Sequence, residues 1–297
     1  MYVTMLGTGA AFADPDRAQS GILVTLNNGT RYMFDCGAGT VRNMVAANAS
    51  PVDVKVVVLT HLHHDHISDF PLFAITGWMW DRDNRPIVLG PKGTKHFCDS
   101  LFEGGAFDSD FRARSAYPLR QNNLEAVRPD IREISPGLIY ENEDVKIWCD
   151  YVEHIPREIS ECFGIRFEAE GKSLAFSGDT APCDNMIKLA KDVDVLFHEC
   201  TFPEAFVEFR KNSGVGTFAH TPPSNLGEIA RDAGVKSLVA THFGHFESTN
   251  PVILKAAEHH LPTNLMGPGI MNDVVLDIRK NYDGPLQMAY DLMRVEV

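Results

Sequence analysis

The chain has 297 residues, of which 44% are hydrophobic, and its formal net charge at pH 7 is −13. This length and apolar content suffice for a large buried core. The negative charge argues against nonspecific binding to nucleic acid, because phosphate contacts need clustered Lys and Arg. Six scattered cysteines without a C-x-x-C pair argue against a disulfide framework. No apolar run is long enough to cross a bilayer.

The first predicted element is a strand from Tyr2 to Leu6. A signal peptide would have a basic segment followed by a longer apolar one, and this stretch has neither. We therefore expect a cytoplasmic protein. Gly7 to Ala10 form a G-x-G turn that lacks the third glycine of a dinucleotide-binding loop. A hairpin from Ile22 to Phe34 follows, built around Asn27-Asn28-Gly29.

The stretch from Val54 to Ser68 reads VKVVVLTHLHHDHIS and contains the strongest chemical signal. Its apolar, β-branched part predicts a buried strand. The strand is followed by His61, His63, His64, Asp65 and His66. Imidazole nitrogen and carboxylate oxygen are ligands that suit zinc. We predict a metal site, in which His61 and His63 converge on one ion while Asp65 and His66 turn to a second.

The H-x-H-x-D-H string resembles the signature of the metallo-β-lactamase superfamily, and the resemblance extends along the chain. In that superfamily single ligands follow later strands. Here His154 follows VKIWCDYVEH, Asp179 lies in FSGDT, and His242 lies in THF. The resemblance implies an α/β fold: a four-layer αββα sandwich with two mixed sheets and helices outside. We expect it to form a single domain over residues 1–297.

The resemblance also implies how the ligands are divided between two metal ions. One ion takes His61, His63 and His154, the other takes Asp65, His66 and His242, and Asp179 bridges both. Asp35, in the Asp-x-Gly turn after the hairpin, is expected to support the ligands from behind. An internal repeat agrees with a duplicated unit, since V-K-x-x-V-x-T-H-x-x-H occurs at 54–64 and again at 235–245.

The segment after the metal motif, DFPLFAITGWMWDRDNRP, is too apolar for a solvated surface. It is either a core helix or, through Trp78 and Trp80, the wall of a pocket for an aromatic substrate. Residues 103–123 are aperiodic and predict a long loop that serves as a lid or a partner contact.

No linker divides the rest of the chain, in which strands and helices alternate. Strands are predicted at Val145–Val152, Phe163–Glu168, Ser173–Phe176, Val193–Phe197 and Val274–Ile278. Helices are predicted at Thr40–Asn48, Thr94–Leu101, Pro203–Asn212, Pro223–Ala233 and Asn250–His260.

The segments FSGDT, LFHECTF and AHT resemble the ribonuclease Z and arylsulfatase-like branch of the superfamily. This similarity implies substrate-side roles for His198, Glu199 and His220. The alternative for each histidine is a hydrogen-bonded core group. Two departures stand out. The two strands predicted between His154 and Asp179 leave no room for the arm with which ribonuclease Z grips transfer RNA. After the last ligand the chain carries Phe-Gly-His-Phe in place of Ser and Arg, so that His245 is the available substitute.

We therefore expect a dinuclear zinc hydrolase that uses a metal-bridging hydroxide, oriented by Asp65, on a small aromatic or cyclic substrate. The electrophile would be an ester, lactone, aryl ether or sulfate, and His220 or His198 would protonate the leaving oxygen. Mn²⁺ or Fe²⁺ could substitute for zinc. One alternative is a phosphodiesterase or endoribonuclease of the ribonuclease Z type. Another is a metal-bearing subunit of a hetero-oligomeric hydrolase.

The expected partner is a small-molecule substrate rather than nucleic acid or a membrane. A homo-oligomer, a dimer as in many proteins of this superfamily, is expected, and a hetero-oligomer is the alternative.

Overall fold

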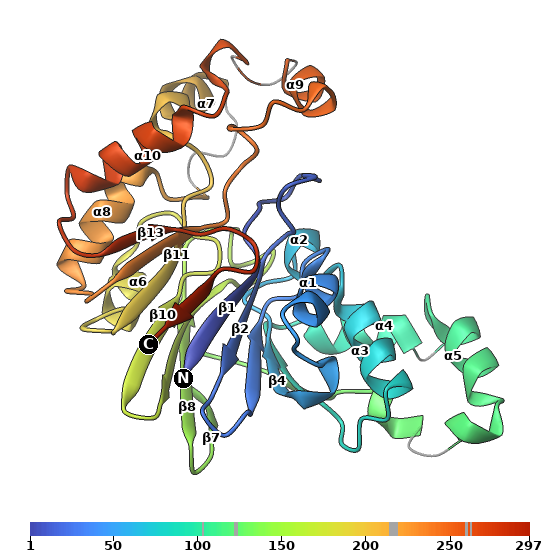
Figure 1. The fold of residues 1–297 in the computed structure, drawn as a ribbon. Coiled ribbons are helices and arrows are strands. Elements are labelled where there is room, and N and C mark those ends of the chain that lie inside the picture. The colour runs from blue at the N-terminus through green and yellow to red at the C-terminus, as the bar shows by residue number, and fades with distance from the viewer. Residues whose placement is uncertain (103, 122–123, 214–218, 259–260, 262) are drawn as a thin grey trace. The chain divides into compact units, whose positions relative to one another are not determined.

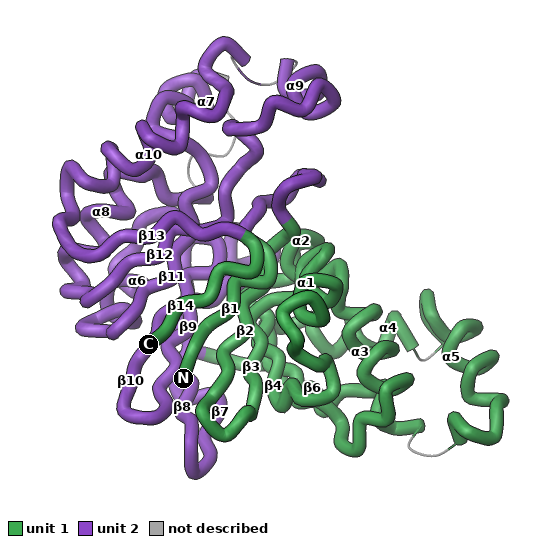
Figure 2. The backbone as a smooth tube through the Cα atoms, viewed as in Figure 1, with its two compact units in different colours: residues 1–7, 18–135, 291–296 green, residues 8–17, 136–290, 297 purple. Residues whose placement is uncertain are grey.

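The computed structural model describes residues 1–102, 104–121, 124–213, 219–258, 261 and 263–297. By its internal contacts the chain divides into two compact units, coloured green and purple in Figure 2. Unit 1 comprises Met1–Gly7, Ala18–Ser135 and Asp291–Glu296, and unit 2 comprises Thr8–Arg17, Pro136–Tyr290 and Val297. The single domain expected over residues 1–297 stays a prediction, because compactness alone does not show whether either unit folds by itself.

Unit 1 contains a seven-stranded sheet in the order β14-β1-β2-β3-β4-β5-β6. The pairings from β14 to β3 are antiparallel and those from β3 to β6 are parallel. The strands are β1 (Tyr2–Gly7), β2 (Gly21–Thr25), β3 (Arg31–Phe34), β4 (Val54–Val58), β5 (Ile87–Gly90), β6 (Asp130–Glu133) and β14 (Arg294–Glu296). The last three residues of β4, Val56 to Val58, are fully buried, as expected for a parallel strand inside a sheet.

The helices of unit 1 lie together on one side of this sheet (Figure 1). They are α1 (Thr40–Ala46), α2 (His64–Ile67), α3 (Phe70–Met79), α4 (Thr94–Phe102) and α5 (Asp108–Ser115), with 3-10 helices η1 (Pro51–Asp53), η2 (Pro118–Arg120) and η3 (Leu124–Val127). One hydrophobic cluster joins sheet and helices, including Val57 of β4, Phe73 of α3, Leu101 of α4 and Phe111 of α5.

Unit 2 contains a second seven-stranded sheet, in the order β13-β12-β11-β10-β9-β8-β7. Its pairings from β7 to β10 are antiparallel and those from β10 to β13 are parallel. The strands are β7 (Gly137–Glu141), β8 (Val145–Tyr151), β9 (Phe163–Ala169), β10 (Lys172–Phe176), β11 (Val195–Glu199), β12 (Leu238–Thr241) and β13 (Leu286–Met288). Strands β9 and β10 lie in the interval between His154 and Asp179, as the sequence predicted, and take up half of it.

The helices of unit 2 come mainly from its second half (Figure 1). They are α6 (Asp184–Leu189), α7 (Val207–Ser213), α8 (Pro223–Asp232), α9 (Pro251–Ala257) and α10 (Ile270–Arg279), with η4 (Glu204–Phe206) and η5 (Thr263–Leu265). A small separate apolar cluster of Phe202, Phe206, Phe246 and Ile270 holds the η4–α7 segment against the start of α10.

The two sheets share one pattern of three antiparallel pairings followed by three parallel ones. This agrees with the duplicated unit that the repeat indicated. The sequence repeat, however, matches β4 with β12. Counted from the antiparallel end of each sheet, β4 is the fifth strand of its sheet, whereas the fifth strand of the other sheet is β11. The repeated letters therefore do not mark equivalent strands.

The structure corrects two of the predicted elements. Val274–Ile278 is not a strand but lies inside α10, because Ile270, Val274 and Ile278 recur every four residues and bury one helical face. The segment 103–123 is not a plain loop, since it contains α5 and η2. Glu103, Asn122 and Asn123, at its ends, lie outside the described residues, as do His259 and His260 of the predicted helix at 250–260.

Among the helices of the described residues, none is both long and apolar enough to cross a membrane.

Candidate metal centre

Unit 1 presents four of the predicted metal ligands at the carboxyl end of β4 and in α2. His61, Asp65 and His66 are at most 2% exposed, whereas His63 is exposed. The ligand atoms of His61 and His63 lie within 4.8 Å of each other, as do those of Asp65 and His66. The rings of His61 and His66 are also close, with centroids 4.0 Å apart. The ligand atoms of unit 1 thus lie in two pairs, His61 with His63 and Asp65 with His66.

Asp35 orients this group of ligands from behind. It follows β3 with φ of 60°, in the left-handed region that Asp tolerates better than most residues. Its Oδ1 accepts a hydrogen bond from the backbone N–H of Thr60 at 2.8 Å. Its Oδ2 accepts one from Nδ1 of His66 at 2.7 Å. Since a buried carboxylate only accepts, Nδ1 of His66 carries the proton and Nε2 carries the lone pair.

Thr60 links Asp35 to a second imidazole, that of His61, and fixes its tautomer. Its hydroxyl lies 3.0–3.1 Å from both oxygens of Asp35 and 3.1 Å from Nδ1 of His61. The hydroxyl has one proton and donates it to the carboxylate, so it accepts from Nδ1–H of His61. His61 therefore also presents Nε2 as a ligand, in the tautomer fixed by Asp35 through Thr60.

Unit 2 presents the other three predicted ligands, each in a loop after a strand. His154 follows β8, Asp179 follows β10, and His242 follows β12. Nε2 of His154 is 3.7 Å from Oδ2 of Asp179, and Nε2 of His242 is 3.3 Å from Oδ1 of the same carboxylate. The two oxygens of Asp179 thus face two different imidazoles, as a carboxylate that bridges two ions would.

Local interactions hold the imidazoles of His154 and His242 in place. Nδ1 of His154 donates to the carbonyl oxygen of Ala219 at 2.7 Å, and burial lowers the pKa of this histidine, against an opposing effect of Asp179. His242 has a φ of 56°, a conformation that β-branched or bulky residues rarely adopt. Burial thus favours a neutral imidazole at His154, and the hydrogen bond to Ala219 holds it in one orientation, as a metal ligand requires.

Glu199, at the end of β11, is the carboxylate around which the unit 2 site is arranged. It is 1% exposed. Its Oε1 accepts from the backbone N–H of Thr180 at 3.0 Å and from Nδ1 of His220 at 2.8 Å. Its Oε2 accepts from the backbone N–H of Thr201 at 3.1 Å and from the Thr201 hydroxyl at 2.8 Å. These donors engage both oxygens, so Glu199 positions the side chains around it.

Thr201 transmits this orientation to a metal ligand. Its hydroxyl lies 2.9 Å from Nδ1 of His242. Having donated its proton to Glu199, the hydroxyl accepts from Nδ1–H of His242, and Nε2 of that imidazole is left to bind a metal. Glu199 therefore orients His220 directly and His242 through Thr201.

His220 lies among the unit 2 ligands without being one of the expected set. Its ring centroid is 4.9 Å from that of His154 and 6.1 Å from that of His242. Burial disfavours its charged form, but the charge of Glu199 and the hydrogen bond to it outweigh burial and raise the pKa of His220 above its ordinary value. In return, His220 overcomes the effect of burial on Glu199 and lowers the pKa of that carboxyl. The pair can hold a proton beside the ligands.

His198 differs from the other histidines for which the sequence predicts substrate-side roles. It is fully buried within β11, and its Nδ1 donates to the carbonyl oxygen of Glu199 at 2.8 Å. Burial lowers its pKa. Because successive side chains of a strand point to opposite faces, His198 faces away from Glu199. This placement agrees with the alternative kept for His198, a hydrogen-bonded core group.

The three predicted pocket residues are placed differently from one another. Trp78 is 3% exposed in the core of unit 1, with its ring 4.9 Å from that of Phe111. Trp80 is 47% exposed but ends α3, about 15 Å along the helix from the end that contacts the ligand loop. The core-helix alternative thus describes this segment. His245 does lie near a ligand, three residues after His242, with its ring edge-on to Phe12 at 4.8 Å.

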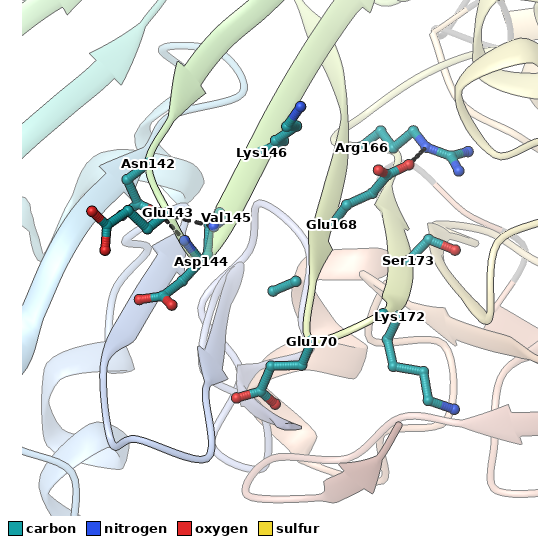
Figure 3. Close-up of a pocket in the computed structure, with 12 residues that line it drawn as sticks. Asn142, Glu143, Asp144, Val145, Lys146, Arg166, Glu168, Glu170, Lys172 and Ser173 are labelled. Atoms are coloured by element: carbon teal, nitrogen blue, oxygen red, sulfur yellow. Dashed lines mark hydrogen bonds and ion pairs between the residues drawn. The ribbon is translucent and has the colours of Figure 1, made fainter.

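Two cavities of unit 2 differ in their relation to these residues. One of about 470 Å³ is lined by residues between Val152 and Cys162, His154 included. Another of about 460 Å³ lies at the β7–β8 and β9–β10 turns (Figure 3). It lies where β8 and β10 begin, whereas the ligands follow where those strands end. Only the first cavity adjoins a predicted ligand.

The donor set fits a zinc-type metal. In His61, His66, His154 and His242 an oxygen acceptor engages Nδ1 and leaves Nε2 as the ligand atom. Asp65 in unit 1 and Asp179 in unit 2 each add a carboxylate, so that each unit offers nitrogen and oxygen donors and no thiolate among these residues. The sequence did not single out Thr60 and Thr201. Their only signal was position, one directly before His61 and the other two residues after Glu199.

Comparison with known proteins agrees with this geometry. The family model of the anti-Pycsar protein Apyc1 matches residues 1–209. A ribonuclease Z from Mycobacterium marinum is 31% identical over 247 residues, covering 81% of this chain and 85% of that protein.

Two solved structures share the fold over nearly their whole length. The metallo-β-lactamase-fold protein YhfI from Bacillus subtilis matches with a TM-score of 0.73 and 18% identity, covering 99% of both chains. The short form of human tRNase Z matches with a TM-score of 0.69 and 20% identity, covering 100% of this chain and 99% of the other. These likenesses, together with two mixed sheets and flanking helices, confirm the expected metallo-β-lactamase fold. The chain belongs to the family of the anti-Pycsar protein Apyc1 and is a metal-dependent hydrolase of the metallo-β-lactamase fold, related to ribonuclease Z.

Proposed function

We propose that this protein is a dinuclear zinc phosphodiesterase that acts on small phosphodiesters. The observation that carries the proposal is the Glu199–His220 pair, at 2.8 Å, placed beside the ligands His154 and His242. A hydrolase needs a proton donor for the leaving oxygen next to its metal, and this pair is built to hold one. The curated relatives at 26–31% identity are ribonucleases, which cleave phosphodiester bonds.

Seven residues would hold the metal. They are His61, His63, Asp65 and His66 of unit 1, and His154, Asp179 and His242 of unit 2. When bound, zinc supplies Lewis acidity and a nucleophile at neutral pH.

The chain's own residues supply proton transfer and orientation. Asp65 is buried beside His66, with 3.6 Å between Oδ2 and Nε2, and can accept a proton as the nucleophile forms. His220 donates through Nε2 to the leaving oxygen, and Glu199 stabilises the charged imidazole while that proton is held. Burial of Asp65 and Glu199, both at most 2% exposed, keeps water from competing for these groups.

Two features favour a small substrate over transfer RNA. The interval between His154 and Asp179 is short and half of it is taken up by β9 and β10, which leaves no place for a long RNA-gripping arm. The net charge of −13 opposes a long polyanion. We therefore keep the expectation of a small aromatic or cyclic substrate, but with a phosphodiester as the reacting bond in place of an ester, lactone, aryl ether or sulfate.

The family description leads to a second part of the proposal, that this chain acts against Pycsar through its hydrolase activity. Expression of the wild-type and Asp65→Ala proteins in cells that carry Pycsar tests it. An effect of the wild type that the variant lacks is expected. Equal behaviour of the two would remove this part and leave the enzymatic proposal standing.

The enzymatic test is a substrate panel with purified, zinc-loaded protein. It contains bis(p-nitrophenyl) phosphate, a cyclic phosphodiester, p-nitrophenyl sulfate, p-nitrophenyl acetate, an aromatic lactone and a precursor transfer RNA. We expect kcat/KM to be highest for a small phosphodiester. Preference for the ester, lactone or sulfate would overturn the phosphodiesterase assignment, and efficient cleavage of transfer RNA would overturn the small-substrate part. Activity of the chain alone would also exclude the need for a second subunit.

A further inference from the structure

A short segment near the start of the chain lies against the residues that follow the ligand His242. This segment, Thr8–Arg17, belongs to unit 2, and we call it the Phe12 loop. The backbone N–H of Phe243 donates to the carbonyl oxygen of Thr8 at 2.8 Å, and that of Ala10 donates to the carbonyl oxygen of Phe243 at 3.0 Å. The Phe12 loop therefore begins directly beside a predicted metal ligand.

Arg17 ties the other end of the Phe12 loop to the same part of unit 2. Its Nε donates to Oε1 of Glu247 at 3.0 Å, and its guanidinium carbon lies 5.0 Å from the ring centroid of Phe243. Its Nη1 also donates to the hydroxyl of Thr8 at 2.8 Å, which joins the two ends of the loop to each other. These contacts restrict the position of the residues between the two ends.

Phe12, between these two ends, is an aromatic side chain that the fold does not bury. It is 66% exposed, and its ring meets that of His245 edge-on with centroids 4.8 Å apart. Single exposed apolar residues are common on protein surfaces. Phe12 differs from a scattered residue because its ring is held against an imidazole only three residues after a predicted ligand. Its exposed surface gains free energy when another apolar group covers it.

The turn that carries His245 is held close to the ligand. The backbone N–H of Gly244 donates to the carbonyl oxygen of Thr201 at 2.8 Å, and the Thr201 hydroxyl lies 2.9 Å from Nδ1 of His242. A Cβ at Gly244 would collide with the ring of Phe246 and lie 2.8 Å from the same carbonyl oxygen, so this turn needs glycine. The threonine that orients a metal ligand therefore also sets the position of His245.

A row of rings runs from Phe12 to the predicted proton donor. The rings of His245 and Phe246 are nearly parallel, with centroids 6.0 Å apart. Phe246 belongs to the small apolar cluster that contains Phe202. The ring of Phe202 in turn meets that of His220 edge-on, with centroids 6.1 Å apart. Phe12 is thus the exposed end of an aromatic row whose buried end is His220.

We propose that Phe12 and His245 bind an aromatic ring of the substrate beside the metal site. They take the role of an aromatic wall, for which the sequence had suggested Trp78 and Trp80. The inference rests on the proposed phosphodiesterase function and deepens it by naming residues that favour an aromatic phosphodiester over an aliphatic one. Any flat aryl or heteroaryl ring can pack on a phenyl face, so the contact selects a class of substrate.

The contact acts on binding and not on the reaction step. The ring that Phe12 covers is not the group that reacts, so the contact is the same in the bound substrate and in the transition state. Its loss therefore raises KM and leaves kcat nearly unchanged.

The experiment compares the zinc-loaded wild type with Phe12→Ala, Phe12→Tyr and Leu276→Ala. Leu276→Ala is the matched control, because Leu276 is an apolar residue of unit 2 that is 63% exposed but lies on α10. Binding of phenylphosphonate and methylphosphonate is measured by calorimetry, since these two probes share the anionic group and differ in the ring. KM and kcat are measured with bis(p-nitrophenyl) phosphate, and circular dichroism reports on folding.

We expect the wild type to bind phenylphosphonate about 3- to 10-fold more tightly than methylphosphonate, the range for one aromatic contact. Phe12→Ala should remove this preference and raise KM for bis(p-nitrophenyl) phosphate by a similar factor, with kcat nearly unchanged. Phe12→Tyr should retain the preference because it keeps the ring, and Leu276→Ala should behave like the wild type.

Equal binding of the two phosphonates by the wild type, or an unchanged preference in Phe12→Ala, would overturn the inference, while phosphodiester turnover by the wild type still supports the proposed function. The same loss in Leu276→Ala would show that the effect is not specific to the Phe12 loop and would also overturn it. A fall of kcat in Phe12→Ala at unchanged KM would contradict a role in binding. A ring preference that depends on Phe12, in a protein that hydrolyses no phosphodiester, would refute the proposed function alone.

Discussion

The ligand groups of unit 1 and unit 2 are built with the same device. In unit 1 the Asp35 carboxylate accepts from His66 directly and holds His61 through the Thr60 hydroxyl. In unit 2 the Glu199 carboxylate accepts from His220 directly and holds His242 through the Thr201 hydroxyl. In both, one buried carboxylate fixes the tautomers of two imidazoles, and the backbone N–H of the threonine also donates to it.

The difference between the groups lies in what the two imidazoles do. Both imidazoles of unit 1 are predicted metal ligands, so Asp35 serves the metal alone. Of the two imidazoles held by Glu199 in unit 2, His242 is a predicted ligand and His220 is the predicted proton donor. Glu199 thus joins the metal site to substrate chemistry.

The largest effect is expected from removing a ligand that also acts on the nucleophile. Asp65→Ala should lower kcat roughly 10²- to 10⁴-fold, because it removes a metal ligand and a proton acceptor together. Steady-state kinetics measures the change, and circular dichroism shows that the fold survives. His64→Ala is the control, because His64 is next to Asp65 in α2 but its side chain is 67% exposed. Turnover like that of the wild type in Asp65→Ala would remove Asp65 from the site.

Changing the two carboxylates separates their roles. Asp35→Asn should weaken zinc binding by about 10- to 100-fold, and excess zinc should restore activity, because the Asp35 carboxylate accepts hydrogen bonds from the predicted ligand His66 and from Thr60. Glu199→Gln should lower kcat by about 10²-fold in a way that excess zinc does not restore, because His220 loses its partner. Zinc titrations of both variants, followed by activity, make the comparison. Full rescue of Glu199→Gln by zinc would show that the two units are alike after all.

The threonines should give smaller and matched effects. Thr60→Val and Thr201→Val each remove one hydroxyl that holds an imidazole, at a cost of about 1 kcal/mol, or roughly fivefold in zinc affinity. Serine at either position keeps the hydroxyl and should restore the affinity. Competition with a chromogenic chelator measures it. A valine variant with the same affinity as its serine counterpart would contradict the relay through the hydroxyl.

The smallest effect is expected at the other end of the unit 2 sheet. Asp194 accepts from the backbone N–H of Ser173 at 2.8 Å and from Nζ of Lys236 at 3.0 Å. Burial would raise the pKa of this carboxyl, but these donors outweigh burial and lower it below 3.8. Its stabilising contribution is therefore complete above that ordinary value and is lost as pH falls through the lowered pKa.

Asp194→Asn should accordingly lower Tm by about 1–3 °C at pH 7, with no change in activity. The difference from the wild type should shrink as the pH falls below 3.8. Thermal melts over this pH range measure it. Loss of phosphodiester turnover in this variant would show that the two ends of the sheet are coupled, against our comparison.

Much of the fold could be predicted because strands and ligands are local patterns. The run Val56 to Val58 gave β4, and the histidines directly after it gave the unit 1 ligands. Asp179 and His242 were predicted from the resemblance to the metallo-β-lactamase superfamily, and each follows an apolar strand, β10 and β12. The prediction of a strand at Val274–Ile278 was wrong. Its β-branched residues are typical of a strand, but their spacing buries one face of the helix α10.

The remaining parts depend on contacts between distant segments. Phe12 meets His245 only because the segment Thr8–Arg17 pairs with the residues after His242, and the sequence shows no motif for it. The assignment of Trp78 to the core required Phe111 of α5, in a segment that reads as a loop. The roles of Thr60 and Thr201 depend on carboxylate geometry, which the type of residue alone does not specify.

The most direct test of the account is a zinc titration of chelator-stripped wild-type protein, with bound zinc and hydrolysis of bis(p-nitrophenyl) phosphate followed together. The account predicts that the stripped protein is inactive, that it binds two zinc ions per chain, and that activity rises as they bind. Hydrolysis by the stripped protein, or two bound ions without hydrolysis of any phosphodiester, would contradict it.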